Sequence, residues 1–114
     1  MKLISHRLKV EGKLSKAVED AVTSAGADLL RRSNQKVPID TGDLAGSGSM
    51  SVDREQNRIE ASIGYNTPYA VEVHENLKAF HPNGGEAKFL ENAYTENAPG
   101  YERLIEDALR ESMK

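Results

Sequence analysis

The sequence predicts an α+β fold in which a long N-terminal helix packs on a small antiparallel β-sheet and C-terminal helices follow. Three observations predict it. Apolar residues recur every three or four positions over residues 14–36, as they do on one face of a helix. Two segments that alternate between apolar and polar residues follow at 44–53 and 58–65, and this is the period of strands. The helical period returns after residue 86, and helices at both ends with strands between them indicate an α+β architecture.

The helix over residues 14–36 is expected to be the longest element, at about 34 Å for about 23 residues. Its apolar stripe is rich in alanine, so another element can approach its backbone closely. Pro38 ends this helix because the residue before a proline is disfavoured in helical geometry. A short N-terminal strand can precede it.

The two alternating segments are expected to pair as a hairpin across the polar residues 54–57. Glycines in the first segment weaken it as a strand and are typical of a bulge or a sheet edge. The segment 69–75 fits either a strand or a short helical turn, and both alternatives stay open. Residues 81–85 predict a loop. Two helices are then expected, one over 86–97 and one that begins at Pro99, because Ala98-Pro99-Gly100 interrupts the pattern.

Composition limits the class of protein. A chain of 114 residues with 38% hydrophobic side chains is expected to form one domain, 1–114, with one modest core. We expect no transmembrane helix and no signal peptide, because the chain has no long apolar run and no apolar segment at its N-terminus. The absence of cysteine excludes disulfides and thiolate sites and fits a reducing cytoplasm. The net charge of −3 argues against a dedicated binder of nucleic-acid backbone, although residues 1–16 are basic.

One candidate metal site stands out among the polar residues. His74, Glu75 and His81, with Glu72 and Glu86 nearby, offer imidazole and carboxylate ligands that suit zinc. Their spacing matches no helical ligand pair, and a Gly/Pro loop around His81 does not fix its geometry. A surface or partner-contacting role is therefore favoured for these residues, and no metal is expected.

No other arrangement forms a convincing active site. A triad of Ser47, His74 and Asp40 lacks the Gly-x-Ser-x-Gly turn of a serine hydrolase. The glycines of the first strand segment are not followed by Gly-Lys-Ser/Thr, as a phosphate-binding loop requires. Arg31 and Arg32 lie near the end of the long helix and fit its dipole better than a nucleic-acid contact. We expect no catalytic residue and no cofactor.

Three segments carry a family resemblance through their order and spacing. Lys-Val-Pro-Ile-Asp-Thr-Gly-Asp-Leu-Ala-Gly-Ser at 36–47 follows the long helix, and Tyr-Ala-Val-Glu-Val-His-Glu at 69–75 follows a strand. His-Pro-Asn-Gly-Gly-Glu-Ala-Lys-Phe-Leu-Glu-Asn-Ala at 81–93 opens the C-terminal helical part. Together they resemble the small head–tail joining proteins of long-tailed bacteriophages and prophages, also labelled minor capsid, neck or tail completion proteins. Many relatives have Glu-x-Gly-Thr after the Tyr-Ala segment, where this chain has Val-His-Glu-Asn at 73–76.

The resemblance implies a structural virion protein that acts in head–tail joining or tail completion as a ring-forming neck subunit, and not an enzyme. The implied partners are other copies of itself in the ring and the connector and tail proteins of the phage. Genomic DNA would pass through the ring without sequence-specific binding, and no membrane is involved. Such a protein would be made in the bacterial cytoplasm and reside in the neck or tail region of the virion. The motif positions are expected to be structural: Pro38, Asp40, Thr41, Gly42, Leu44, Tyr69, Ala70, His74, Glu75, Phe89, Leu90 and Ala93.

The loop over 76–86 is the candidate assembly interface. Leu77 and Phe80 are apolar within a polar stretch, and His81 adjoins them. These side chains are expected to contact a neighbouring subunit, where apolar anchors supply most of the binding energy. The alternative for Phe80 is that it packs against the sheet of its own chain. Two rival functions also stay open: a small metal-dependent enzyme built on His74, Glu75 and His81, and a host adaptor protein that uses this region.

Overall fold

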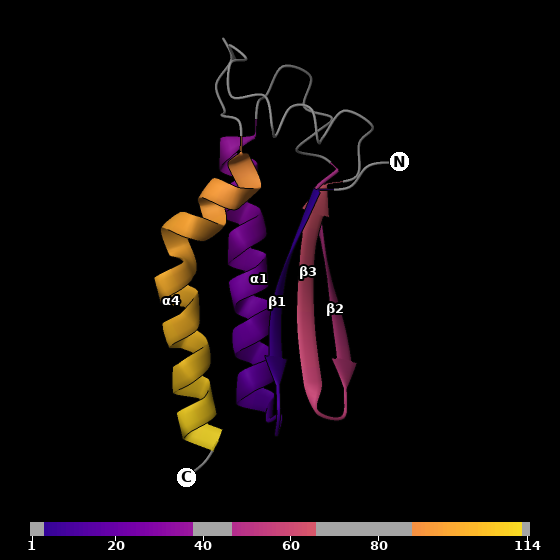
Figure 1. The fold of residues 1–114 in the computed structure, drawn as a ribbon, viewed down its shortest axis with the longest axis vertical. Helices are drawn as coiled ribbons and strands as arrows, with labels where there is room; N and C mark the ends of the chain where they lie inside the picture. Colours follow the sequence, from indigo (N-terminus) through magenta and orange to yellow (C-terminus); the bar gives the residue numbers. More distant parts are fainter. Residues whose placement is uncertain (1–3, 38–46, 66–87, 113–114) are drawn as a thin grey trace.

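The computed structural model describes residues 4–37, 47–65 and 88–112, and these ranges hold two helices and three strands (Figure 1). The predicted α+β class is confirmed for them, as is the long helix that precedes a hairpin. The short strand that the sequence allowed before the long helix is present and joins the sheet. One expectation needs correction, because one helix rather than two follows the sheet in the described residues. The order is β1 (Ile4–Glu11), α1 (Lys16–Lys36), β2 (Ser49–Glu55), β3 (Arg58–Tyr65) and α4 (Phe89–Ser112).

The sheet is antiparallel and has the order β1-β3-β2, so the last strand in sequence lies in the middle. Lys9 on β1 and Asp53 on β2 both pair with Glu60 on β3. The hairpin between β2 and β3 turns through Gln56 and Asn57, as the sequence predicts. Because β1 and β2 both run antiparallel to β3, they run parallel to each other, and each forms one edge of the sheet.

Helix α1 approaches the sheet closely. Ser15 caps its first turn by accepting a hydrogen bond from the backbone N–H of Val18, and the helix ends before Pro38, as predicted. A Cβ at Gly26 would lie 2.8 Å from the sulfur of Met50 and 3.1 Å from a methyl group of the sheet. Only glycine fits this contact without a shift of its neighbours. The small residues of the stripe thus let α1 pack directly on the strands.

Strand β2 is more exposed than the alternation over 44–53 predicts. The described strand begins at Ser49, and Leu44 lies outside the described residues. Met50 is partly covered, whereas Val52 is 42% exposed. Helix α1 packs mainly on the central strand and makes fewer contacts with the edge strand β2. On the central strand the alternation holds, and the residues buried there are Ile59, Ala61, Ile63 and Tyr65.

Helix α4 continues through the predicted break at Ala98-Pro99-Gly100, so the expectation of two C-terminal helices is wrong. Figure 1 shows that the helix bends between its orange N-terminal part and its yellow C-terminal part. Pro99 explains the bend because its nitrogen carries no hydrogen to donate to the preceding turn. Ala93 and Tyr101 are buried on the two sides of the proline. Their packing holds both parts of the helix in place and outweighs the local preference for a break.

The core lies between the sheet and the two helices. Figure 1 shows α1 and α4 next to each other, both helices contact the sheet, and residues of all three contribute to one apolar cluster. Leu29 on α1, Ile63 on β3 and Phe89 on α4 are each fully buried in it. Neither of the helices described is long and apolar enough to span a bilayer.

Candidate assembly surfaces

The structure describes three of the residues singled out by the resemblance. Phe89, Leu90 and Ala93 lie in the first turns of α4, and all three are buried. The Phe89 ring meets the ring of Tyr65 edge to face, with the ring centroids 5.0 Å apart. The start of α4 is thus packed against the end of β3. The other motif and interface positions lie outside the described residues: Pro38, Asp40, Thr41, Gly42, Leu44, Tyr69, Ala70, His74, Glu75, Leu77, Phe80 and His81.

Tyr65 also joins the end of the sheet to the end of α1. Its hydroxyl donates to Asn34 Oδ1 at 2.6 Å and lies 2.8 Å from Ser33 Oγ. Burial raises the pKa of Tyr65 to about 12, so the hydroxyl stays protonated at neutral pH. A Cβ at Gly48 would lie 2.9 Å from the Tyr65 ring, so glycine lets β2 approach here. The alternating pattern identified Tyr65 as a strand residue but gave no sign of these polar partners.

A second polar cluster joins α1 to α4 around Asp28. Its carboxylate accepts hydrogen bonds of 2.7 Å from the Tyr101 hydroxyl, Arg31 and Arg32. Burial alone would raise the pKa of Asp28, but the hydrogen bonds from Tyr101 and the two arginines together lower that pKa to about 2. Burial and the carboxylate raise the pKa of Tyr101. Arg31 and Arg32 therefore bind a side chain of their own helix, where the sequence suggested the helix dipole as their partner.

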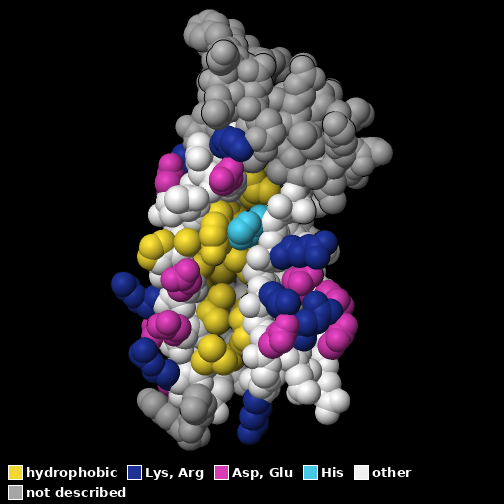
Figure 2. Space-filling model, in the orientation of Figure 1, with side chains coloured by type: hydrophobic (Ala, Val, Ile, Leu, Met, Phe, Trp, Pro, Cys, Tyr) yellow, Lys and Arg dark blue, Asp and Glu magenta, His cyan; other side chains and the backbone are white. Residues whose placement is uncertain are grey.

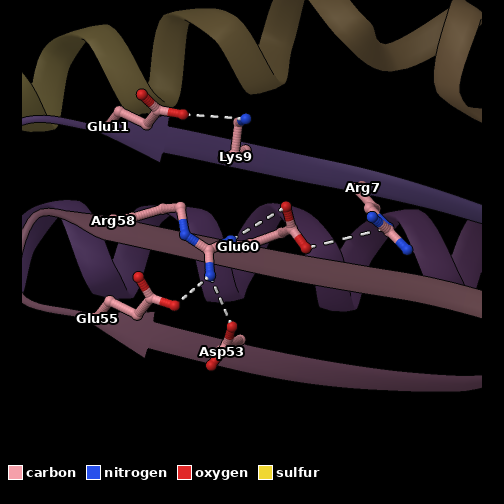
Figure 3. Close-up of polar contacts among 7 residues, drawn as sticks. All are labelled: Arg7, Lys9, Glu11, Asp53, Glu55, Arg58 and Glu60. Carbon is pink, nitrogen blue, oxygen red and sulfur yellow. Dashed lines mark hydrogen bonds and ion pairs between the residues drawn. The ribbon is translucent and has the colours of Figure 1, made fainter.

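Charged side chains cover the face of the sheet that points away from α1, and Figure 3 shows them. Arg58 lies at the centre of the group. Its guanidinium is 2.8 Å from a carboxylate oxygen of Asp53, 2.8 Å from one of Glu55 and 3.4 Å from one of Glu60. The hydrogen bond that Arg58 donates to Glu55 is the largest cause that raises the pKa of Arg58. On the neighbouring strand, Lys9 pairs with a glutamate two residues further on at 3.0 Å.

This charged face does not suit nucleic-acid binding. The seven residues drawn in Figure 3 comprise three bases and four acids, so their net charge is −1. The bases are paired with neighbouring carboxylates, such as Arg58 with Glu55 and Arg7 with Glu60. A surface that binds phosphates needs an excess of positive charge. The face is therefore polar and nearly neutral, as expected for a surface that meets protein or water.

An open groove runs between β1 and α4, visible as the yellow column in Figure 2. Its volume is about 510 Å³. Four consecutive residues of β1, 7–10, line one side, so the strand backbone itself forms part of the wall. Bases border the groove on the β1 side and acids border it on the α4 side. The lining comprises Arg7, Leu8, Lys9, Val10, Tyr94, Tyr101, Glu102, Ile105 and Glu106.

The groove was not predicted from the sequence, because its two walls lie about 90 residues apart in the chain and no local pattern connects them. Its upper part is aromatic: the His6 ring lies 3.9 Å from the Tyr94 ring, centroid to centroid. Burial lowers the pKa of His6 and so favours the neutral ring. The groove therefore combines an apolar floor with a strand edge.

The structure gives no support to a metal centre in the part of the chain that it describes. Among residues 4–37, 47–65 and 88–112, no three His, Asp or Glu side chains are grouped as metal ligands. The candidate ligands His74, Glu75 and His81 lie outside these ranges, as do the triad partners of Ser47.

Comparison with known proteins identifies one family. The model of the family described as "Bacteriophage HK97-gp10, putative tail-component" matches residues 3–92. The match begins at β1, extends into the first turn of α4, and contains the segments 36–47 and 69–75 that carry the resemblance. No curated protein and no solved structure matches the chain significantly.

Proposed function

The chain belongs to the HK97 gp10-like family of bacteriophage tail components, and we propose that it is a ring-forming subunit of the phage neck that acts in head–tail joining or tail completion. The match over residues 3–92 carries this proposal, because it covers most of the chain. The role is structural rather than enzymatic. The protein would be assembled into the virion after synthesis in the cytoplasm of the bacterial host.

The described surfaces support an assembly role. A groove with an apolar floor and a strand edge suits a protein partner, and it holds none of the convergent catalytic groups of an active site. We propose that the partners are other copies of the chain, the phage connector and the tail proteins. The nearly neutral face of the sheet is compatible with DNA passing by without being bound.

Deletion of the gene from the phage or inducible prophage that encodes it tests this function. We expect lysates that contain DNA-filled heads and separate tails, counted by electron microscopy, and few infectious particles. A plasmid copy of the wild-type gene is the control and should restore joined virions. Mass spectrometry of purified virions should detect the protein. Normal yields of infectious particles from the deletion, or virions that lack the protein, would contradict the proposal.

A further inference from the structure

We propose that neighbouring copies of this chain join head to tail, with the free edge of β1 in one copy pairing with the free edge of β2 in the next. One sheet would then continue from copy to copy. The inference deepens the proposed function and rests on its premise that the chain forms a ring. It identifies the two surfaces that such a ring must bring together.

The backbone of β1 offers hydrogen-bonding groups on its outer side. The N–H of Gly12 donates to the carbonyl of Asn57 at 2.8 Å, so the even-numbered residues of β1 bond toward β3. The odd-numbered residues, such as Arg7 and Lys9, then direct their N–H and C=O groups outward. No backbone group elsewhere in the described ranges pairs with these two residues. An unpaired strand edge is a template for another strand.

The edge of β2 is open in the same way. Glu55 and Arg58 flank the two-residue turn and pair with each other, so the odd-numbered residues of β2 bond toward β3. The outward groups belong to Met50, Val52 and Arg54. No strand in the described residues covers this edge, which is the end of the sheet opposite β1.

The two edges suit a ring because they are different and run in the same direction. Pairing β1 with β2 of the next copy gives a parallel, head-to-tail contact, which can repeat around a cyclic axis. Pairing of like edges would instead require a two-fold axis and would stop at a dimer. Lys9 and Asp53 lie level with each other within one copy, because both pair with Glu60. In the proposed contact the copies join without a shift along the strands, so Lys9 of one copy would lie beside Asp53 of the next.

The direction and the difference of the two edges identify a second copy as the partner. On the face away from α1, Lys9 would lie beside Asp53 of the next copy, and these charges are opposite. Glu11 would lie beside Glu55 of the next copy, and these charges are alike. The Lys9–Asp53 pair therefore favours the contact at one position of this face.

On the opposite face β2 presents Val52, which is 42% exposed, whereas Arg54 beside it is ion-paired with Glu19 of its own chain. The groove beside β1 offers an apolar floor for the valine. Strand addition uses this combination of backbone hydrogen bonds and side-chain pockets.

Layer widths determine how a continued sheet would curve. Three strands occupy about 14 Å across the sheet, whereas two helices side by side need about 16–20 Å. Because α1 and α4 lie side by side on one side of the sheet, repeated copies must curve with the helices outside. The charged face of Figure 3 would then line the inside of the ring. Its internally paired charges fit this position.

Engineered disulfides test the contact, since the chain contains no cysteine. Arg7 and Ser51 both pair with Ser62, so within one copy their Cα atoms lie two strand spacings, about 10 Å, apart. This is too far for a disulfide, whereas the proposed contact brings them within about 5 Å. We expect the variant with Arg7→Cys and Ser51→Cys to form a ladder of covalent oligomers on mild oxidation at high protein concentration.

Matched variants make the result specific. The pair Ser5→Cys and Glu55→Cys lies on the same strands but about 20 Å out of register, and should form no ladder. In the Arg7→Cys/Ser51→Cys background, Val52→Glu should reduce the ladder at least tenfold (about 1.4 kcal/mol). Leu104→Glu should leave it unchanged, because Leu104 is equally exposed but lies in a different hollow, between α4 and α1.

Three outcomes would overturn the contact: no ladder at the highest soluble concentration, an equal ladder from the control pair, or dimers from Arg7→Cys alone. Oxidation of virions that carry the paired cysteines separates this inference from the proposed function. If the protein is present in virions without the disulfide, the contact is wrong and the function stands. If the protein is absent from virions, the proposed function fails.

Discussion

The two faces of β3 differ in how much they contribute to the stability of the fold. Ile59, Ala61 and Ile63 point toward α1 and are at most 2% exposed. Arg58 and Glu60 alternate with them and point the other way, into a layer of ion pairs. Tight apolar packing contributes several kcal/mol per residue, whereas exposed ion pairs contribute little. The inner face therefore holds the fold, and the outer face contributes little to stability.

The largest effect that this comparison predicts is on the inner face. Ile63→Ala should lower the free energy of unfolding by about 2–5 kcal/mol, because it leaves a cavity in a packed core. Ser62→Ala, one residue away on the outer face, should change it by less than about 0.5 kcal/mol. Urea denaturation followed by circular dichroism measures both. Equal losses in the two variants would mean that the faces do not differ as described.

A second prediction concerns the close approach of α1 to the inner face. Gly26→Val should destabilise the fold by about 1–3 kcal/mol, because the new side chain overlaps Met50 and Ala61. Ala27→Val on the exposed side of the same helix is the control, and it should cost only the difference in helix propensity, about 0.6 kcal/mol. If thermal unfolding of the two variants coincides, α1 does not pack as tightly on the sheet as the structure indicates.

The inner face was largely predictable from the sequence because its signals are local. The spacing of apolar residues predicted α1, and the alternation of apolar and polar residues predicted β3. The polar residues just before β3 predicted the hairpin turn. Helix α4 was divided wrongly at Pro99 because the burial of Ala93 and Tyr101 on both sides of the proline is a tertiary effect. Local preference carries no information about such packing.

The candidate assembly surfaces were not predictable in this way. The groove joins β1 to α4, and the open edges exist because β3 pairs with a strand about 50 residues earlier in the chain. Such pairings depend on the fold as a whole and leave only weak local patterns. The residues that the resemblance singled out identified the family, yet apart from Phe89, Leu90 and Ala93 they lie outside the described residues.

A third prediction uses pH to test the polar cluster around Asp28, which joins α1 to α4. The pKa of Asp28, about 2, lies below the ordinary value of about 3.9. The ionised carboxylate therefore stabilises the fold fully above about pH 4, and this contribution is lost as the pH falls through about 2. Asp28→Asn should be less stable than the parent at pH 7, with the difference shrinking toward pH 2. Asp20→Asn on the exposed side of α1 is the control. A difference that does not change with pH would contradict the assignment.

The smallest effect is expected on the outer face. Arg58→Met removes the centre of the charged group in Figure 3 but leaves the packing against α1 intact. We expect a small decrease in melting temperature at low ionic strength that disappears in high salt, because salt screens exposed ion pairs. Arg103→Met, exposed on α4, is the control and should show no such salt dependence. A decrease as large as that of Ile63→Ala, or one that persists in high salt, would show that the outer face also holds the fold. The distinction between a face that holds the fold and a face that does not would then have to be abandoned.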